Sequence, residues 1–341
     1  MKPPWEGTWN GARYRPGGGD HLESYVLKAT APDAERAFWI NATIRSSAAD
    51  EPESAVAEAW AIAFDRREDA PDHVAVKHTI PFAETSFDER DLGIEWFVPG
   101  TADAMMLSPG AARGTISTGD HQIEWDLTFP TETRPLVTLP FQRLYTSPLP
   151  RTKQVSPYPD VRMSGTVRVD DTEWNAAGWY GMQGHSWGAH QVELQAWCHC
   201  NHWQEEEDLV LEASSARVRA GPVLLPAVSL VNVRFRGADY PFNALLEWVR
   251  TRADVGLRRF TFSAQCRRGR IQALVEAPVE DFVGLRYRNP SGPTTHCLNS
   301  KLATGRLRFE PHGQPPVELT TRAAALEVST LRADHGVKMV A

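Results

Sequence analysis

Hydrophobic and polar positions alternate over much of the chain, which predicts a protein built mainly from β-strands. The run 121–129 is typical, because every second residue is apolar and these residues would share one face of a strand: Ile123, Trp125, Leu127 and Phe129. Residues 259–266 and 270–275 flank Arg267-Arg268-Gly269, a spacing typical of a hairpin. Glycine and proline recur between such runs, as they do in β-barrels and β-sandwiches.

The segment 54–64 permits two interpretations. Its alanine content is high enough for a helix. However, its larger apolar residues alternate strictly with alanines: Val56, Trp60, Ile62 and Phe64. We therefore predict a strand here. Glu58 is the one charged residue on the apolar face of that strand, and a carboxyl group among apolar neighbours is a candidate proton donor. The alternative is a carboxylate at a strand end, paired with an arginine at the surface.

Proline is concentrated between residues 146 and 159. Because proline lacks a backbone donor and favours extended connections, this stretch predicts a linker between two units of similar size. We place the boundary after residue 155, which gives units 1–155 and 156–341. Each is long enough to bury its own core.

Composition and charge narrow the class of protein. The 341 residues carry a formal net charge of −7 and are 42% hydrophobic, which is ordinary for a globular protein and argues against a nucleic-acid-binding protein. No run approaches the ~20 apolar residues of a membrane span, and the first residues lack the apolar core of a secretory signal. With only four cysteines, we expect a cytoplasmic protein without a disulfide framework.

Residues 178–203 hold the densest group of histidines and tryptophans. If 191–203 is a strand, one of its faces is both aromatic and polar and carries Gln191, Glu193, Gln195, Trp197, His199, Asn201 and Trp203. Such a face suits the lining of a ligand cavity. It suits equally well an outer face that packs on a neighbouring domain.

His185 and Trp187 share one face of a strand that is flanked by glycines. Glycine allows close backbone approach and often lies beside functional sites. A histidine in this position can give or take a proton near neutral pH. The alternative is a structural histidine that is hydrogen-bonded to the backbone.

Metal and cofactor motifs are not evident. His199, Cys200 and His202 are close in sequence, but on a strand His199 points away from the other two. The chain has no His-Glu-x-x-His helix and no glycine-rich phosphate-binding loop. We therefore expect no metal and no cofactor.

Two short motifs resemble a known superfamily. Gly184-His185-Ser186-Trp187-Gly188, followed by 196–203, is similar to segments of the superfamily that contains carotenoid 1,2-hydratase and the AttH-like proteins. Tocopherol cyclases and the fungal decalin-forming Diels–Alderases look related. The resemblance spans most of the chain. It implies two tandem lipocalin-like β-barrels with a hydrophobic pocket at or near their interface, acting without a cofactor on polyenes, prenyl chains or dienes. In the hydratases a His-x-Trp pair belongs to the active site, which maps onto His185 and Trp187, whereas a downstream tyrosine and aspartate find no match here.

Together these observations predict an all-β protein of two tandem lipocalin-like antiparallel barrels. The expected function is cofactor-independent cyclisation, isomerisation or hydration of a hydrophobic alkene-containing small molecule in secondary metabolism. We expect His185, with Glu58 second, to act in catalysis. The residues expected to contact the substrate are aromatic or polar: Trp60, Trp187, Trp197, His199, Asn201 and Trp203. The alternatives are a non-catalytic carrier of lipophilic ligands and a scaffold that only presents surfaces.

Overall fold

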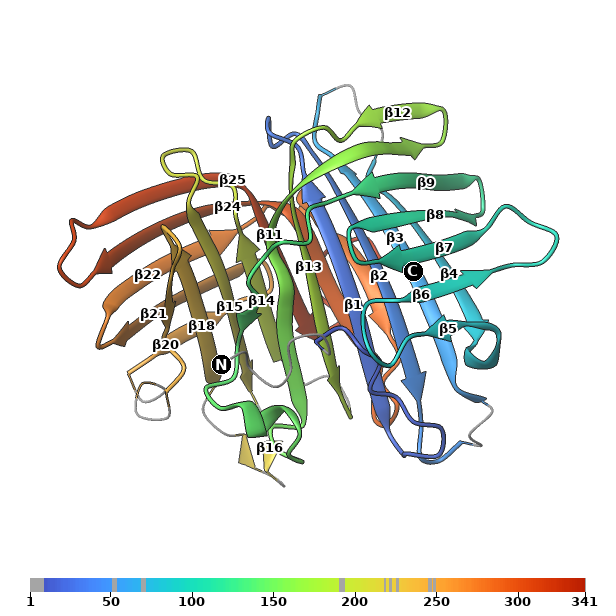
Figure 1. Cartoon of the computed structure of the whole chain (residues 1–341), viewed down its shortest axis with the longest axis horizontal. Helices are drawn as coiled ribbons and strands as arrows, with labels where there is room; N and C mark the ends of the chain where they lie inside the picture. Colours follow the sequence, from blue (N-terminus) through green and yellow to red (C-terminus); the bar gives the residue numbers. More distant parts are fainter. Residues whose placement is uncertain are drawn as a thin grey trace.

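The chain folds into two large antiparallel β-sheets that lie against each other (Figure 1). The computed structural model describes residues 9–50, 54–68, 72–189, 194–217, 219–220, 223–224, 227–244, 247 and 250–340. The prediction of an all-β protein with antiparallel sheets is confirmed.

The first sheet has 13 strands in the order β4-β3-β2-β1-β13-β11-β9-β8-β7-β6-β5, with β10 and β12 also paired to β11. Their bounds are β1 His21–Thr30, β2 Arg36–Ser46, β3 Val56–Asp65, β4 Val74–Pro81, β5 Ser86–Phe87, β6 Ile94–Phe97, β7 Ala104–Ser108, β8 Ala111–Thr118, β9 His121–Thr128, β10 Leu136–Val137, β11 Thr152–Val169, β12 Thr172–Asn175 and β13 Trp179–Gly188. The sheet curls so far that β4 meets β8. There the backbone N–H of Lys77 donates to Thr118 Oγ1 (3.0 Å), and the Thr118 hydroxyl donates back to the Lys77 carbonyl (2.9 Å).

The second sheet has 10 strands in the order β19-β18-β15-β14-β25-β24-β22-β21-β20, with β23 paired to β24. Their bounds are β14 Leu194–Cys200, β15 Leu209–Arg217, β18 Val228–Phe235, β19 Ala238–Pro241, β20 Arg252–Val255, β21 Arg259–Cys266, β22 Gly269–Glu276, β23 Val283–Tyr287, β24 Thr295–Pro311 and β25 Val317–Thr330. A separate pair is formed by β16 Arg219–Ala220 and β17 Val223–Leu224, and single 3-10 turns are η2 Phe82–Glu84, η3 Gln142–Tyr145 and η4 Val279–Asp281.

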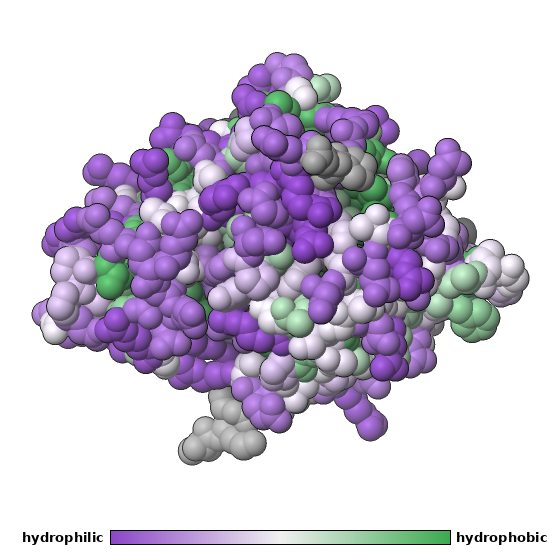
Figure 2. Space-filling model, turned by 90° about the horizontal axis from the view of Figure 1, so that it is seen from above, coloured by the Kyte–Doolittle hydropathy of each residue, from purple (hydrophilic) through white to green (hydrophobic). Residues whose placement is uncertain are grey.

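Each sheet has its own hydrophobic core, and a third core lies between the sheets. The first sheet encloses residues such as Phe38 and Trp125, and the second encloses residues such as Phe260 and Phe309. The face of the molecule shown in Figure 2 is largely hydrophilic, with its hydrophobic residues scattered. The apolar residues of both sheets are thus used mainly inside the fold.

Several strand predictions are confirmed. Segment 54–64 is a strand (β3), and residues 259–276 form the expected hairpin, in which Cys266 pairs with Gly269. The alternation of large and small residues predicted β3 correctly, whereas the alanine content would have predicted a helix. Both faces of this strand are buried: the small alanines face the core of the first sheet, and Trp60 and Phe64 face the second sheet.

The proline-rich stretch is not a linker between the two sheets. Residue 155 lies inside β11, which pairs with β13 and β9 of the first sheet. Pro157 and Pro159 fall where the β11–β13 register shifts, between Val155 and Tyr158 and between Tyr158 and Val161. A proline is tolerated at such irregularities because no ladder hydrogen bond is required of it. The chain passes from one sheet to the other only after Gly188, so the boundary expected at residue 155 does not coincide with this change.

Gly165 lies at the point where β11 turns from β13 to β9. Its φ is +127°, and a Cβ built on it would lie 2.0 Å from the Asp126 carbonyl oxygen. We therefore expect Gly165→Ala to lower the free energy of unfolding by about 3 kcal/mol, through backbone strain and overpacking together. Urea unfolding measures this. Gly119→Ala is the control, since Gly119 also has positive φ but open space around it, and it should cost only about 1 kcal/mol. Equal losses in the two variants would contradict the steric explanation.

Candidate active site

The two sheets pack face to face, and most of their contact is apolar. Trp39, Trp60 and Phe64 of the first sheet meet Leu285 and Leu302 of the second in one buried cluster. Of the face predicted on residues 191–203, Gln191 and Glu193 lie outside the described residues. In β14 this face does both things considered for it: Trp197 packs on Met182 of the first sheet, and Gln195 and Trp197 also line a cavity. At one end of the contact, however, the sheets separate and leave a cavity.

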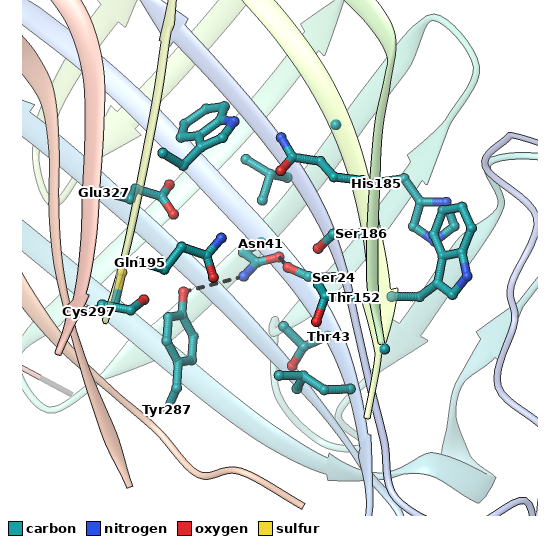
Figure 3. A pocket seen from close by; sticks show the side chains of 18 of the residues that line it. Ser24, Asn41, Thr43, Thr152, His185, Ser186, Gln195, Tyr287, Cys297 and Glu327 are labelled. Carbon is teal, nitrogen blue, oxygen red and sulfur yellow. Dashed lines mark hydrogen bonds between the residues drawn. The ribbon is translucent and has the colours of Figure 1, made fainter. Parts of the chain in front are cut away.

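The cavity has a volume of about 130 Å³, and its walls come from both sheets. The first sheet contributes residues of β1, β2, β11 and β13, and the second contributes residues of β14, β23, β24 and β25 (Figure 3). It opens at the strand ends near Thr152, which is exposed, and near Leu22 and Gly188, which are half-buried. The site is therefore a joint product of the two sheets.

The cavity lining has an apolar wall and a polar wall, which lie side by side: Val26 pairs with Asn41 on the first sheet, and Trp197 pairs with Glu327 on the second. Val26, Met182 and the ring of Trp197 form the apolar wall, with Met182 and Trp197 packed together on Ala325. The polar wall includes Asn41 and Tyr287. A compact ligand would thus meet aromatic surface and hydrogen-bonding groups next to each other.

Glu327 is the acidic residue of the cavity wall. Its Oε1 accepts a hydrogen bond from Lys301 Nζ at 2.7 Å. Lys301 is fully buried, also donates to Asn299, and lies between the rings of Trp39 and Trp197. Burial lowers the pKa of Lys301, while the carboxylate of Glu327 opposes that shift. The ion pair holds the Glu327 carboxylate, which is partly exposed, at the edge of the cavity, where it can give or take a proton.

Tyr287 presents a hydroxyl group to the cavity from β23. Asn41 Nδ2 donates to Tyr287 Oη at 3.5 Å, shown as the dashed line in Figure 3. The ring of Tyr287 packs on Trp60, with 5.5 Å between ring centroids. Burial raises the pKa of Tyr287 well above its usual value, so the hydroxyl stays protonated and available as a donor.

A second buried acid lies behind the wall. Glu212 of β15 accepts hydrogen bonds from Trp197 Nε1 (3.1 Å), Gln154 Nε2 (2.6 Å) and the Ser156 hydroxyl (2.9 Å). Burial raises its pKa, and these donors only partly offset the shift. Glu212 therefore fixes the orientation of Trp197 and Gln154, both of which line the cavity.

His185 and Trp187 border the cavity, but the His185 ring lies on the far side of β13 from Ser186 (Figure 3). Its Nδ1 is 2.6 Å from the Trp9 carbonyl oxygen and its Nε2 is 2.8 Å from Glu23 Oε1. Both ring nitrogens thus face acceptors, as in the structural alternative considered for this residue. His185 would have to give up one of these hydrogen bonds before it could pass a proton to a ligand.

Of the residues of β14 and beyond that were expected to touch substrate, only Trp197 lines the cavity. His199 is buried deeper between the sheets, where its Nε2 donates to the Pro159 carbonyl (2.9 Å). Asn201 accepts from Lys28 Nζ (3.0 Å) and donates to Asp160 (2.8 Å). Trp203 belongs to the core of the second sheet.

The two residues predicted on β3 also lie away from the cavity. Glu58 is buried and forms an ion pair with Lys77 (2.7 Å), whose Nζ is 4.0 Å from the centre of the Trp60 ring. Trp60 lies behind Tyr287 rather than on the cavity surface. Its contribution is to hold Tyr287.

The segment 184–188 also matches Gly-x-Ser-x-Gly, the pattern of serine-hydrolase nucleophile elbows. That chemistry needs a sharp strand-to-helix turn. Here the whole segment lies within β13, so the structural context of an elbow is missing.

Within the described ranges, no group of three or more His, Cys, Asp or Glu side chains is arranged to hold a metal ion. Among these residues, no helix has the length and hydrophobicity needed to cross a membrane.

Sequence reasoning missed the polar wall. Glu327 and Tyr287 were not selected, although Glu327 is the one charged residue in the apolar run 323–328 and that pattern could have marked it. Lys301 likewise interrupts a buried stretch of β24. No pattern in the sequence connects these residues with Asn41.

Comparison with known proteins gives limited sequence similarity and clear similarity of fold. No protein-family model matches the sequence. Uncharacterized proteins from two strains of Mycobacterium tuberculosis, CDC 1551 and H37Rv, are each 28% identical over 185 residues, which is 54% of this chain and 54% of each relative. The chain thus spans about half the length of the curated relatives it matches.

Three solved structures resemble the whole chain. CghA, solved with Sch210972, has a TM-score of 0.59 at 12% identity and covers 91% of this chain and 88% of its own. A protein of Nitrosomonas europaea assigned as AttH has a TM-score of 0.52 at 13% identity, with 96% of both chains covered. Kievitone hydratase from Nectria haematococca has a TM-score of 0.52 at 8% identity and covers 92% and 89%.

The fold therefore defines an all-β protein of the two-sheet, lipocalin-like type. At these identities the similarity concerns the fold alone. At that level it confirms the predicted resemblance of fold to an AttH-like protein.

Proposed function

We propose that the protein is a cofactor-independent enzyme that cyclises, isomerises or hydrates an alkene-containing small molecule. The observation that carries this proposal is the cavity between the sheets, whose lining combines the Glu327 carboxylate, the Tyr287 hydroxyl and the Trp197 ring, with Glu327 and Trp197 as neighbours on paired strands. The similarity of fold to a kievitone hydratase, and to a protein solved with Sch210972, supports it.

The proposed reactions require only two kinds of group in the site. An aromatic face stabilises positive charge that develops on an alkene carbon, and a carboxyl group gives or removes the proton. Both act more strongly in a cavity that excludes water. The ordered wall formed by Met182 and Trp197 supplies the apolar surface, and Lys301 fixes the carboxylate.

The volume of the cavity limits the ligand. A space of about 130 Å³ is close in size to an engineered cavity of ~150 Å³ that binds benzene. The reacting part of the substrate is therefore compact, and any longer chain must leave through the opening near Thr152. A long lipid would not fit wholly inside.

Filling the cavity tests this proposal. Ser186 lines the cavity and is half-buried, so we expect Ser186→Phe to reduce turnover and ligand binding at least about tenfold, by occupying the space the ligand needs. Turnover of a panel of prenyl, polyene and diene compounds is followed by mass spectrometry, and binding by tryptophan fluorescence. Ser108→Phe, at a half-buried position of β7 outside the cavity, is the control.

The outcomes separate the alternatives. Equal turnover in the wild type and Ser186→Phe would contradict the assignment of the cavity as the active site. Binding that Ser186→Phe abolishes, without conversion of any compound, would favour the carrier. Neither binding nor conversion would favour the scaffold.

A further inference from the structure

The hydrogen bonds of the polar wall run in one direction. The Ser24 hydroxyl donates to Asn41 Oδ1 at 2.6 Å, and Asn41 Nδ2 donates to Tyr287 Oη at 3.5 Å. The short distance is typical of O–H···O and the long one suits a weak N–H···O contact, which agrees with this orientation of the amide. Asn41 therefore points an N–H at the Tyr287 oxygen from a neighbouring position on the cavity wall.

The Tyr287 hydroxyl can therefore still donate a hydrogen bond. Its oxygen accepts from Asn41, so its own hydrogen must point elsewhere, and no acceptor for it is found in the described part of the chain. The hydroxyl lines the cavity. A buried donor without an acceptor is costly, and a ligand oxygen at this position would satisfy it.

The carboxylate of Glu327 has one free oxygen. Lys301 binds Oε1, whereas Oε2 has no hydrogen-bond partner among the described residues. Lys301 is itself held by Asn299 and is fully buried, so the position of Glu327 Oε1 is fixed. A carboxylate with one oxygen fixed and the other free, beside a cavity, is placed to act as a base.

We infer that the substrate is an enolisable unsaturated carbonyl compound, whose carbonyl oxygen binds Tyr287 and whose acidic C–H faces Glu327. This inference rests on the proposed function and deepens it, because it assigns the substrate class and the reaction. The reaction is a shift of the double bond between the β,γ and α,β positions.

The step balances without any other reactant. Glu327 Oε2 takes the proton from the α-carbon, and the electron pair of the broken C–H bond forms the enolate, whose oxygen accepts the Tyr287 hydrogen bond. The dienolate then takes the same proton back from Glu327 at its γ-carbon. The product is an isomer of the substrate, and the enzyme returns to its starting state. Tyr287 acts as the donor that stabilises the enolate oxygen.

Cyclohex-3-en-1-one is a probe of suitable size, since its conversion to cyclohex-2-en-1-one is followed by ultraviolet absorbance. We expect the wild-type protein to accelerate this conversion. Glu327→Gln should reduce the rate about 10²–10⁴-fold and Tyr287→Phe about 10²–10³-fold. Glu318→Gln and Tyr240→Phe are matched controls outside the cavity and should leave the rate unchanged. If Glu327→Gln fails to fold, Glu327→Asp serves, because it retracts the carboxylate while keeping an acidic partner for Lys301.

Binding of a pair of ligands separates this inference from the proposed function. Cyclohex-2-en-1-one should bind about tenfold more weakly to Tyr287→Phe than to the wild type, whereas cyclohexene should bind both equally. Equal binding of the ketone to both proteins, or isomerisation unaffected by Glu327→Gln, would overturn the inference and leave an alkene-binding cavity in place. No binding of either ligand to the wild type would overturn the inference and the proposed function together.

Discussion

Glu23→Gln should lower the free energy of unfolding by about 3–5 kcal/mol, because it removes a buried carboxylate on which several buried hydrogen-bond donors converge. The Glu23 carboxylate is fully buried and accepts hydrogen bonds from five groups: the backbone N–H of Arg13 and of Tyr14, the His21 and His185 rings, and the Tyr25 hydroxyl. An amide at this position would point its own N–H groups at these donors. Glu23 ties the segment that precedes β1 to β13, so we expect that segment to loosen first.

The pH dependence of the difference in stability between the wild type and Glu23→Gln provides a second measurement. Burial alone would raise the pKa of Glu23, but hydrogen bonds from His185 and His21 outweigh burial and hold it far below its usual value near 4.5. A carboxyl group with a depressed pKa contributes stability above its unfolded pKa and loses it as the pH falls. The difference between the wild type and Glu23→Gln should therefore be full above about pH 5 and shrink in stronger acid.

Urea unfolding at several pH values measures both effects. Glu124→Gln is the control, because Glu124 is exposed and pairs only loosely with Arg168 (3.6 Å). Its effect should stay within about 0.5 kcal/mol. A loss in Glu23→Gln as small as in the control would show that the five hydrogen bonds contribute little net stability.

Trp60→Ala should cost about 3–5 kcal/mol, the usual loss for truncating a fully buried aromatic residue. Trp60 is completely buried in the core between the sheets and packs edge-on against Tyr287. Its removal leaves a void in the contact that joins the two sheets and withdraws support from a residue of the cavity wall. We expect a lower urea midpoint and weaker ligand binding in the same variant.

The control removes an aromatic ring where nothing packs on it. Phe97 is 68% exposed, so Phe97→Ala should change the free energy of unfolding by no more than about 0.5 kcal/mol. If Trp60→Ala lost stability without any effect on binding, the role assigned to Trp60 behind Tyr287 would be wrong.

Much of the fold could be read from the sequence because strand periodicity is a local property. The alternation in 54–64 and 121–129 identified β3 and β9 correctly. Periodicity could not show whether the prolines near residue 157 lie in a linker or in a bulged strand. A bulge and a linker both tolerate proline, and only the pairing partners of β11 distinguish them.

The candidate site was predicted less completely. Periodicity correctly placed His185 and Trp187 on one face, but it could not show that the His185 ring is held at the border of the cavity by Glu23 and the Trp9 carbonyl. Trp197 was selected for its face and does line the cavity, whereas Trp203 lies beyond the end of β14 and no longer follows its alternation. Asn41 and Tyr287 are separated by more than two hundred residues, so their contact depends on how the sheets pack.

Because both sheets line the cavity, exchanging either sheet would change the site. Each sheet supplies roughly one half of the site, with Asn41 from the first and Tyr287 and Glu327 from the second. Exchanging all strands after Gly188 with those of a relative would replace Tyr287 and Glu327 while keeping Asn41. Under the proposed function, substrate preference would then depend on which two sheets are combined. Chimeras joined between β13 and β14 offer a direct route to new preferences, provided that the apolar contact around Trp60 is preserved.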